Sequence, residues 1–414
     1  MDNDDLTRLS AALTGRRVRV VELQTTLTAC KAVGPENGGD GEMEKIRRIT
    51  GWLTACGVRD MQRFDALDTR VADGIRPNLV ARVPGKSART LWIFGHTDVV
   101  PPGDSTAWSS DPWTVRQEDD RLYGRGVEDN QQAIAGMLIL AEELHALRMR
   151  PRLTLGLVFM ADEECGSDYG LGHLLQHADG LFSPDDLYIV PDAGSPDADR
   201  IEVAEKGQIW LQVRITGEQC HAAMPHKGRN AFLAGANMAL TCHHCLHTAF
   251  PGTDPLFDPP CSTFVPSKHE ANVPNINTVP GSDVFYMDCR LLPDVSPEAV
   301  LAKSRDVARE VAGRHNVNIV VNVVREQAAS AISPQEPVVE ALRKAVSHVY
   351  EVCARPIGIG GATVAALLRH RGFPAAVWSC LANTCHQPDE YSMISATIKD
   401  AQVFAHILMH ADHA

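Results

Sequence analysis

The sequence lacks any apolar run of the roughly 20 residues that a membrane-spanning helix needs. It also lacks the basic start of a secretory signal, because three of its first five residues are aspartates. From these two absences we expect neither a membrane-spanning segment nor export. The expected location is the cytoplasm.

Positive charge is also scarce. The chain of 414 residues has 39 Lys and Arg against 52 Asp and Glu, a formal net charge of −13. Because like charges repel at long range, this balance argues against a nucleic-acid partner. A small-molecule ligand remains open, and we expect neither nucleic acid nor a membrane as a partner.

A disulfide framework is missing as well. The 11 cysteines are odd in number and scattered along the sequence. A chain of this size does not need disulfide bonds for stability, so reduced thiols are expected. One cluster of Cys and His could be a zinc-binding motif: Cys242-His243-His244-Cys245, followed by His247. It lies within a helical pattern over 230–250, and no second Cys or His pair follows at finger spacing, so a metal there is not expected.

The length and the 44% of apolar residues are enough for two hydrophobic cores, so two domains are expected. In the first 60 residues the apolar spacing predicts two amphipathic helices, over 4–28 and 41–56. These helices carry no recognisable chemistry. We interpret them as scaffold.

The first stretch that suggests chemistry is 91–103. Its apolar run ends in Gly95, continues with His96 and Asp98, and then turns on two prolines and a glycine. This pattern indicates a buried strand that delivers an imidazole and a carboxylate to a loop. Taken alone, it could equally be a strand end with a satisfied histidine and a turn aspartate.

Further polar groups follow other predicted strands or begin a predicted helix. Asp129 precedes the helix 131–147, where the ordinary role of an aspartate is an N-cap. Glu163 and Glu164 lie beside Asp162 after the strand 153–160, and this acidic turn could simply be solvated. Asp192 and His386 follow the strands 187–190 and 375–378.

Open α/β sheets bind ligands at the carboxyl ends of their strands, so these groups can converge on one crevice. Two histidines and three carboxylates would give each of two metal ions one histidine and one carboxylate, with an aspartate shared between them. That is the composition of a two-zinc hydrolytic centre. The candidate ligands are His96, Asp129, Glu164, Asp192 and His386.

Between Asp192 and His386 the pattern of elements changes. Strands and helices over 207–324 alternate as β-α-β-β-α-β, the ferredoxin-like order, and this segment could stand as an inserted domain.

Five motifs resemble the M20 metallopeptidases, in order and over essentially the whole chain. They begin at Gly95 (GHTDVVPPG), Gly124 (GRGVEDN), Asp162 (DEECGS), His221 (HAAMPHKGRNA) and His386 (HQPDE). The resemblance implies an α/β fold: a zinc-exopeptidase-like catalytic domain with a mostly parallel sheet between helices, and an inserted ferredoxin-like lid and dimerisation domain. The implied boundaries are 1–206 and 325–414 for the catalytic domain and 207–324 for the insert.

The resemblance also implies roles at the metal centre. His96 and Glu164 would each bind one of two zinc ions with Asp129 bridging, and Asp192 and His386 would complete the ligand set. The peptide bond after Asp129 would be cis. Cobalt or manganese would accept the same ligands.

Two further residues of these motifs would support or perform the chemistry. Asp98 would hydrogen-bond His96 and fix its tautomer. Glu163 would be the general base.

In the insert, the resemblance implies that His221 reaches the active site of the other subunit of a homodimer and stabilises the oxyanion. Asn277 and Arg290 would hold the carboxylate of the substrate, and Gly360, Gly361 and Thr363 would line its pocket. Each of these residues has a simpler interpretation. His221 could be an ordinary surface histidine, Arg290 could lie on a solvated strand face, and the two glycines could form a simple turn.

The chain departs from the common family pattern in three places. Asn130 follows the bridging aspartate, in an Asn-Gln-Gln run where many members have a lysine. Asp192 replaces the glutamate of the desuccinylase and glutamate carboxypeptidase branches, which weighs against a strict desuccinylase. Ala222 and Ala223 follow His221 where serine is common.

We therefore expect a two-zinc hydrolase that cleaves the amide bond of N-acyl amino acids. The alternative within the same class is a dipeptidase or carboxypeptidase that acts on short peptides. A metal-binding homologue without turnover is a remote alternative, because such a protein has no need of Glu163 beside a full ligand set.

Overall fold

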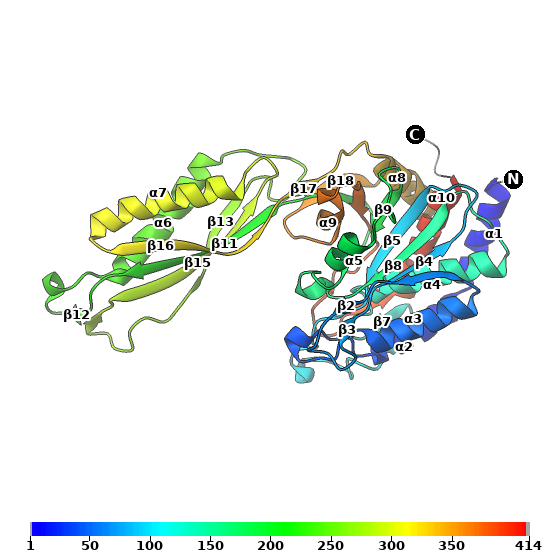
Figure 1. Cartoon of the computed structure of the whole chain (residues 1–414), viewed down its shortest axis with the longest axis horizontal. Coiled ribbons are helices and arrows are strands. Elements are labelled where there is room, and N and C mark those ends of the chain that lie inside the picture. The colour runs from blue at the N-terminus through cyan, green and yellow to red at the C-terminus, as the bar shows by residue number, and fades with distance from the viewer. Residues whose placement is uncertain (1, 411–414) are drawn as a thin grey trace. The chain divides into compact units, whose positions relative to one another are not determined.

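The computed structural model describes residues 2–410 and divides into two compact units. The first unit comprises Met1–Val203, Ile332–Pro356 and Thr363–Ala414, and the second comprises Ala204–Ala331 and Ile357–Ala362. Figure 1 shows their helices and strands and labels many of them. Among the described residues, no helix has the length and apolar character needed to cross a membrane.

A twisted mixed sheet forms the centre of the first unit. Its four central strands, in the order β8, β5, β9 and β19, run parallel, whereas β1, β4 and β10 pair antiparallel at its two sides. The mostly parallel sheet predicted from the sequence is therefore confirmed. The strand bounds are β1 Asp60–Arg63, β4 Leu79–Val83, β5 Thr90–His96, β8 Thr154–Met160, β9 Leu187–Val190, β10 Arg200–Glu205 and β19 Ala375–Val377.

The central strands are buried because helices cover the sheet. Every residue of β5 is buried, and alternate side chains such as Trp92 and Phe94 pack with α5 and α9. Gly95 lies against Ile134 and Met137 of α4 on the other face. This two-sided burial explains why β5 is an unbroken apolar run in the sequence.

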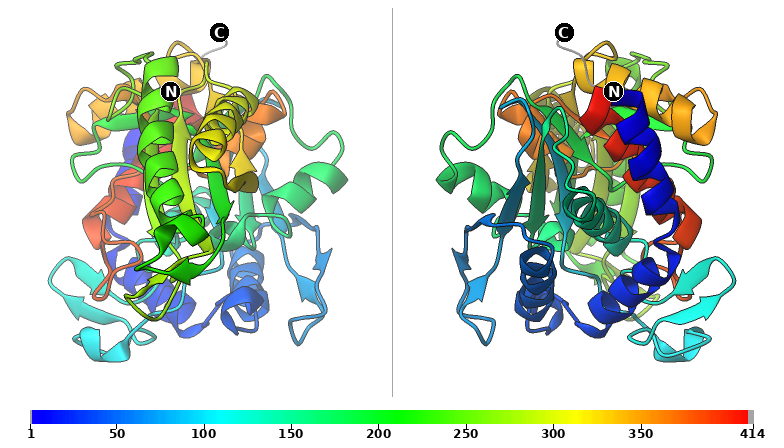
Figure 2. Two further views of the ribbon diagram at one scale, coloured as in Figure 1. Left: turned by 90° about the vertical axis from the view of Figure 1, so that its left-hand side faces the viewer. Right: turned by 90° about the vertical axis from the view of Figure 1, so that its right-hand side faces the viewer.

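Helices α1 and α10 lie side by side, as the blue and red helices in the right-hand view of Figure 2 show, and Gln402 donates a hydrogen bond to the Ser10 carbonyl at 2.9 Å. The predicted helix over 4–28 is two helices, because the chain turns at Gly15 and Arg16. The helices of this unit are α1 Asp2–Thr14, α2 Arg17–Ala29, α3 Met43–Ala55, α4 Gln131–Ala146, α5 Leu171–His177, α8 Pro337–Tyr350, α9 Ala365–His370 and α10 Ile394–His410.

The second unit has the ferredoxin-like order predicted from the sequence. Its antiparallel sheet has the strand order β13-β15-β11-β16, and α6 and α7 pack against it around a separate apolar core. Asn230 and Ser296 cap the two helices by accepting hydrogen bonds from backbone N–H groups. The bounds are β11 Gly207–Thr216, α6 Ala231–Ala249, β13 Thr263–His269, β15 Ser282–Leu291, α7 Pro297–His315 and β16 Asn318–Gln327.

The remaining strands are short. They are β2 Ala66–Leu67, β3 Ile75–Arg76, β6 Arg116–Glu118, β7 Arg121–Tyr123, β12 Cys220–His221, β14 Thr278–Val279, β17 Ser330–Ala331, β18 Arg355–Ile359 and β20 Tyr391–Met393.

All 11 cysteines are free thiols. In the Cys-His cluster of α6, Cys242 is buried in the core of the second unit and the ring of His243 hydrogen-bonds the Phe264 carbonyl at 2.6 Å. These side chains serve packing and local hydrogen bonding.

Candidate metal centre and active site

The five predicted ligands meet at the carboxyl ends of the parallel strands. His96 is the last residue of β5, Glu164 lies in the short 3₁₀ turn after β8, and Asp192 follows β9. Asp129 lies just before α4, and His386 lies in the loop between β19 and β20. Parallel strands place their carboxyl ends at one edge of the sheet, which is why residues so distant in sequence converge.

Asp129 lies between the two histidines. Its Oδ1 is 2.8 Å from His96 Nε2, and its Oδ2 is 3.1 Å from His386 Nε2. Each histidine also contacts a second carboxylate: His96 Nε2 is 3.4 Å from Asp192 Oδ1, and His386 Nε2 is 3.1 Å from Glu164 Oε2. The peptide bond between Asp129 and Asn130 is cis, as the resemblance implies.

This arrangement fits two metal cations. One set of donors is His96, Asp192 and one oxygen of Asp129, and the other is His386, Glu164 and the second oxygen of Asp129. Two histidine nitrogens and three carboxylates, with one carboxylate shared, match the ligand chemistry of a binuclear zinc site.

In the protein without cations, protons compensate this concentration of carboxylates. Hydrogen bonds to Asp129 and Glu164 raise the pKa of His386 to about 10. Burial disfavours the charged form of His96, but hydrogen bonds to carboxylates, Asp129 first, outweigh it and raise the pKa of His96 well above its usual value. Cations that bind here must displace these protons.

Glu163 lies beside the metal ligands and has no side-chain hydrogen bond among the described residues. One of its carboxylate oxygens lies with donor atoms of His96 and Asp192, all within 4.8 Å of one another. Burial, followed by the negative charge of Asp192, raises the pKa of Glu163 well above its usual value. A carboxylate of this kind can accept and return a proton near neutral pH.

Asp98 connects His96 to the turn that carries the two glutamates. Its Oδ1 lies 3.3 Å from His96 Nδ1, and its carbonyl oxygen lies 3.1 Å from the same nitrogen. The backbone N–H groups of Glu163 and Glu164 donate to the two carboxylate oxygens of Asp98 at 3.1 and 3.0 Å. Asp98 thus orients a candidate ligand and the candidate base together.

Several supporting residues were not predicted from the sequence. Asn130 donates to Asp192 Oδ1 at 2.9 Å and to the Pro191 carbonyl at 2.8 Å. The fully buried Arg76 pairs with Glu42 and lies 3.5 Å from Asp162, just before the Glu163 turn. Arg76 belongs to no motif, so only its position in the fold reveals this role.

The predicted residues of the second unit form two separate groups. His221, in β12, pairs with Thr278, and Asn277 lies beside it, since its carbonyl accepts a hydrogen bond from Ala222 at 2.9 Å. Arg290 lies elsewhere: its Nε donates to Asp288 at 2.7 Å and its Nη1 donates to the Gly360 carbonyl at 3.0 Å.

The other glycine-loop residues follow Gly360. Gly361 is next in the chain and also belongs to the second unit. Thr363 belongs to the first unit, where its hydroxyl accepts a hydrogen bond from Ala365 at the start of α9.

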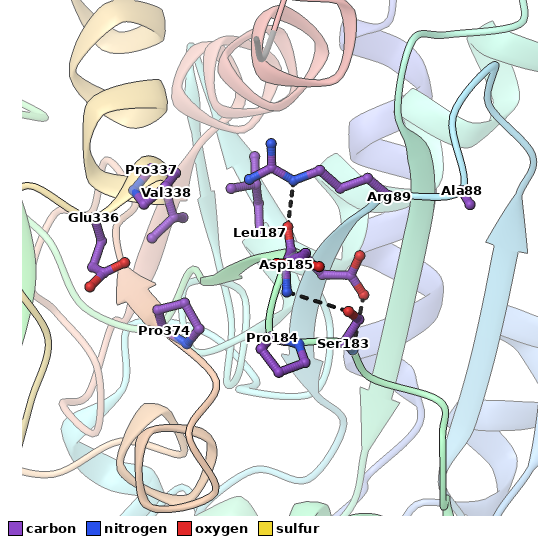
Figure 3. A pocket seen from close by; sticks show the side chains of 11 residues that line it. Ala88, Arg89, Ser183, Pro184, Asp185, Leu187, Glu336, Pro337, Val338 and Pro374 are labelled. Atoms are coloured by element: carbon purple, nitrogen blue, oxygen red, sulfur yellow. Dashed lines mark hydrogen bonds between the residues drawn. The ribbon is translucent and has the colours of Figure 1, made fainter. Parts of the chain in front are cut away.

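A hollow of about 660 Å³ lies at the other edge of the first unit's sheet, where β5, β9 and β19 begin (Figure 3). The Arg89 Nε donates to the Asp185 carbonyl there, and the buried Asp186 accepts from Thr90 at 2.7 Å and from Trp92 at 2.9 Å. The polar groups at this edge serve local structure, whereas the candidate ligands gather at the opposite strand ends.

Comparisons with known proteins find related sequences over most of the chain. A family model for peptidase family M20/M25/M40 matches residues 92–410. An uncharacterised metallohydrolase of Methanococcus maripaludis is 35% identical over 409 residues, 94% of this chain and 98% of the relative. A succinyl-diaminopimelate desuccinylase of Cereibacter sphaeroides is 28% identical over 376 residues, 89% of this chain and 93% of the relative.

Solved structures extend the likeness to the fold. Human carnosine dipeptidase 1 superposes with a TM-score of 0.73 at 15% identity and covers 98% of both chains. At this identity the likeness concerns the fold alone.

Proposed function

We propose that this chain, which belongs to peptidase family M20/M25/M40 and is a metal-dependent hydrolase, cleaves the amide bond of N-acyl amino acids with two zinc ions per subunit. The observation that carries the proposal is the position of Asp129 between His96 and His386, with Glu163 beside them. A cytoplasmic location remains part of the proposal.

Bound at these donors, two cations would lower the pKa of a water molecule and polarise the substrate carbonyl. Glu163 then accepts a proton from the attacking water and returns it to the leaving amine, which balances the hydrolysis to a free amine and a carboxylate. Asp98 keeps His96 and the Glu163 turn in place throughout.

The carboxylate of the amino acid would be bound by Arg290 beside the loop of Gly360, Gly361 and Thr363. Asp288 and the Gly360 carbonyl hold the guanidinium in one orientation. A fixed, planar guanidinium suits recognition of a carboxylate.

His221 would act in the active site of a second subunit. Arg290 lies opposite Gln208 near the start of β11, and the chain reaches His221 only after Thr216, at the far end of that strand. Eight strand residues span about 26 Å, too far for both side chains to hold one amino acid. Because the Asn277 carbonyl bonds Ala222 next to His221, we propose that Asn277 acts with His221 at the oxyanion.

The second unit offers a surface for this dimer. Phe232, Leu233 and Leu240 on α6 are exposed, and so is Val265 on β13, which is an edge strand of the sheet. Exposed apolar groups beside an unpaired strand edge are typical of a protein interface. We propose that a second copy of the chain covers this surface, and that the unit also serves as a lid.

The choice between a deacylase and a peptidase rests on the relatives. Several curated relatives, at 26–31% identity, are succinyl-diaminopimelate desuccinylases, whereas the dipeptidase similarity is a likeness of fold alone. We therefore favour N-acyl amino acids, with Asp192 arguing against a strict succinyl specificity. Dipeptides and short peptides with a free carboxyl end are the second candidate.

The test measures bound metal and turnover together. Purified protein should hold about two zinc ions per subunit and hydrolyse at least one member of a panel of acetyl-, succinyl- and aminoacyl-amino acids. A chelator should abolish the activity, and zinc or cobalt should restore it. Protein that binds two ions but hydrolyses nothing in the panel would favour the non-catalytic alternative.

A further inference from the structure

Two buried glutamates join the loop that carries Asp129 to the loop that carries His386. Glu128 precedes the proposed bridging aspartate, and Glu390 follows the proposed histidine ligand by four residues. Both side chains are almost completely buried, at 2% and 0% exposure. Neither belongs to the predicted ligand set.

Glu390 receives the backbone of the Asp129 loop. Its Oε1 accepts from the N–H groups of Glu128 and Asp129 at 2.9 and 3.1 Å. Its Oε2 accepts from the Gly126 N–H at 3.0 Å and from Arg125 Nη1 at 2.6 Å. Four donors on one carboxylate fix the course of the chain just before the bridging aspartate.

Glu128 makes the reciprocal connection. Its Oε1 accepts from the Asn383 N–H at 2.9 Å, and its Oε2 accepts from the Thr384 N–H and hydroxyl at 2.6 and 2.7 Å. Thr384 lies two residues before His386. Each loop therefore supplies a carboxylate that holds the backbone of the other loop.

We propose that Glu128 and Glu390 are positioning residues that keep Asp129 and His386 in register, so that the cation shared by Asp129, His386 and Glu164 binds tightly only while both connections are intact. The cation at His96 and Asp192 depends on them less, because β5, Asp98 and Asn130 hold those two ligands. This inference rests on the proposed metal-dependent function.

The experiment compares Glu128→Gln and Glu390→Gln with Glu143→Gln. Glu143 is also buried and forms an ion pair, with Arg16. It lies 12 residues beyond Gln131, where α4 begins next to the Asp129 loop, and is therefore about 18 Å along the helix from that loop. Metal-free proteins are titrated with zinc and with cobalt, whose visible absorption reports the coordination of each site. Thermal unfolding of the metal-free proteins measures any general loss of stability.

Wild type and Glu143→Gln should bind two ions. Each positioning variant should keep one ion and bind the second roughly 10- to 100-fold more weakly, the range for residues that orient metal ligands. Excess metal should restore much of the turnover, which a general packing defect would not allow.

If either variant fails to fold, Thr384→Val provides a second test, because it removes one donor to Glu128. This variant should weaken binding of the same ion by roughly tenfold.

Two ions bound with wild-type affinity in the glutamine variants would overturn the inference, and so would an equal loss in Glu143→Gln. A wild-type protein without bound metal would instead overturn the proposed function. The two failures are therefore distinguishable.

Discussion

Glu163 and Glu164 are neighbours in sequence, but their surroundings differ. The Glu164 side chain contacts His386, whereas the Glu163 side chain has no hydrogen bond to any described residue and lies beside His96 and Asp192. The backbone N–H groups of both residues donate to Asp98, which fixes the turn that carries them. This difference makes the proposed division between a ligand and a base testable.

We predict that Glu163→Ala keeps both metal ions and loses turnover by about a thousandfold, within the range of general acid–base effects. Metal content and kcat, measured on the same preparation, check this. Glu164→Ala is the matched comparison, since it should lose metal as well as turnover. Normal turnover in Glu163→Ala would contradict the assignment.

Arg290→Ala should raise KM roughly 10- to 100-fold with a smaller change in kcat, because a hydrogen bond to a charged group contributes about 1.5–3 kcal/mol. Steady-state kinetics on an N-acyl amino acid measure both constants. Arg314→Ala, in an exposed ion pair with Glu310 on α7, serves as the control. An unchanged KM would exclude Arg290 from carboxylate binding.

At the scale of elements, the central strands of the sheet were predicted mainly from apolar runs that are followed by polar residues. Apolar runs that are followed by His, Asp or Glu led to β5, β8, β9 and β19, since parallel strands buried on both faces form near-continuous apolar runs. The helix over 4–28 was wrong in one respect, because its apolar spacing continues across the break at Gly15. Periodicity alone does not reveal a turn between two helices that pack on the same core.

The supporting residues of the site could not be predicted in the same way. Glu128, Glu390, Asn130 and Arg76 act through partners 34 to 262 residues away, and a single sequence contains no signal for such pairs. Their roles follow only from the assembled loops.

Helices α8 and α10 bring three histidines together. The ring of His406 lies beside those of His348 and His410, with ring centres 4.9 Å apart in both pairs. Burial, assisted by these two neighbours, lowers the pKa of His406 to about 4. The folded state therefore favours neutral His406. Between the two pKa values, the unfolded chain binds a proton that the folded chain excludes, and this difference lowers the free energy of unfolding.

The sign of the effect follows from linkage. Because the pKa of His406 is lower in the folded state than its usual 6.5, the free energy of unfolding should fall as the pH drops from about 6.5 towards 4. We expect His406→Gln to lose less stability over this range, by on the order of 1 kcal/mol after allowance for solvent screening. Urea unfolding at pH 7.5 and pH 5 measures the difference; equal losses would contradict it.

At the scale of the whole molecule, the length of β11 makes dimerisation part of the proposed chemistry. If His221 acts in the partner's active site, a hybrid of Glu163→Ala and His221→Ala subunits contains one complete site. A statistical mixture of the two inactive variants should then recover about a quarter of wild-type activity, since half of its dimers are hybrids with one working site each.

The measurement is turnover after subunit exchange, with hybrid formation verified by differently tagged subunits. Two copies of the same variant, mixed in the same way, are the control. Verified hybrids without activity would show that each subunit uses its own His221.

The proposed ligands span the chain from His96 to His386, and no shorter segment contains both histidines. During synthesis, the donor set is therefore incomplete until most of the polypeptide has been made. A growing chain has no way to capture two zinc ions as a pair, and neither has a fragment truncated before His386. If the centre holds two cations as proposed, metal loading follows translation, and supply of the ion to the finished protein then governs how much active enzyme forms.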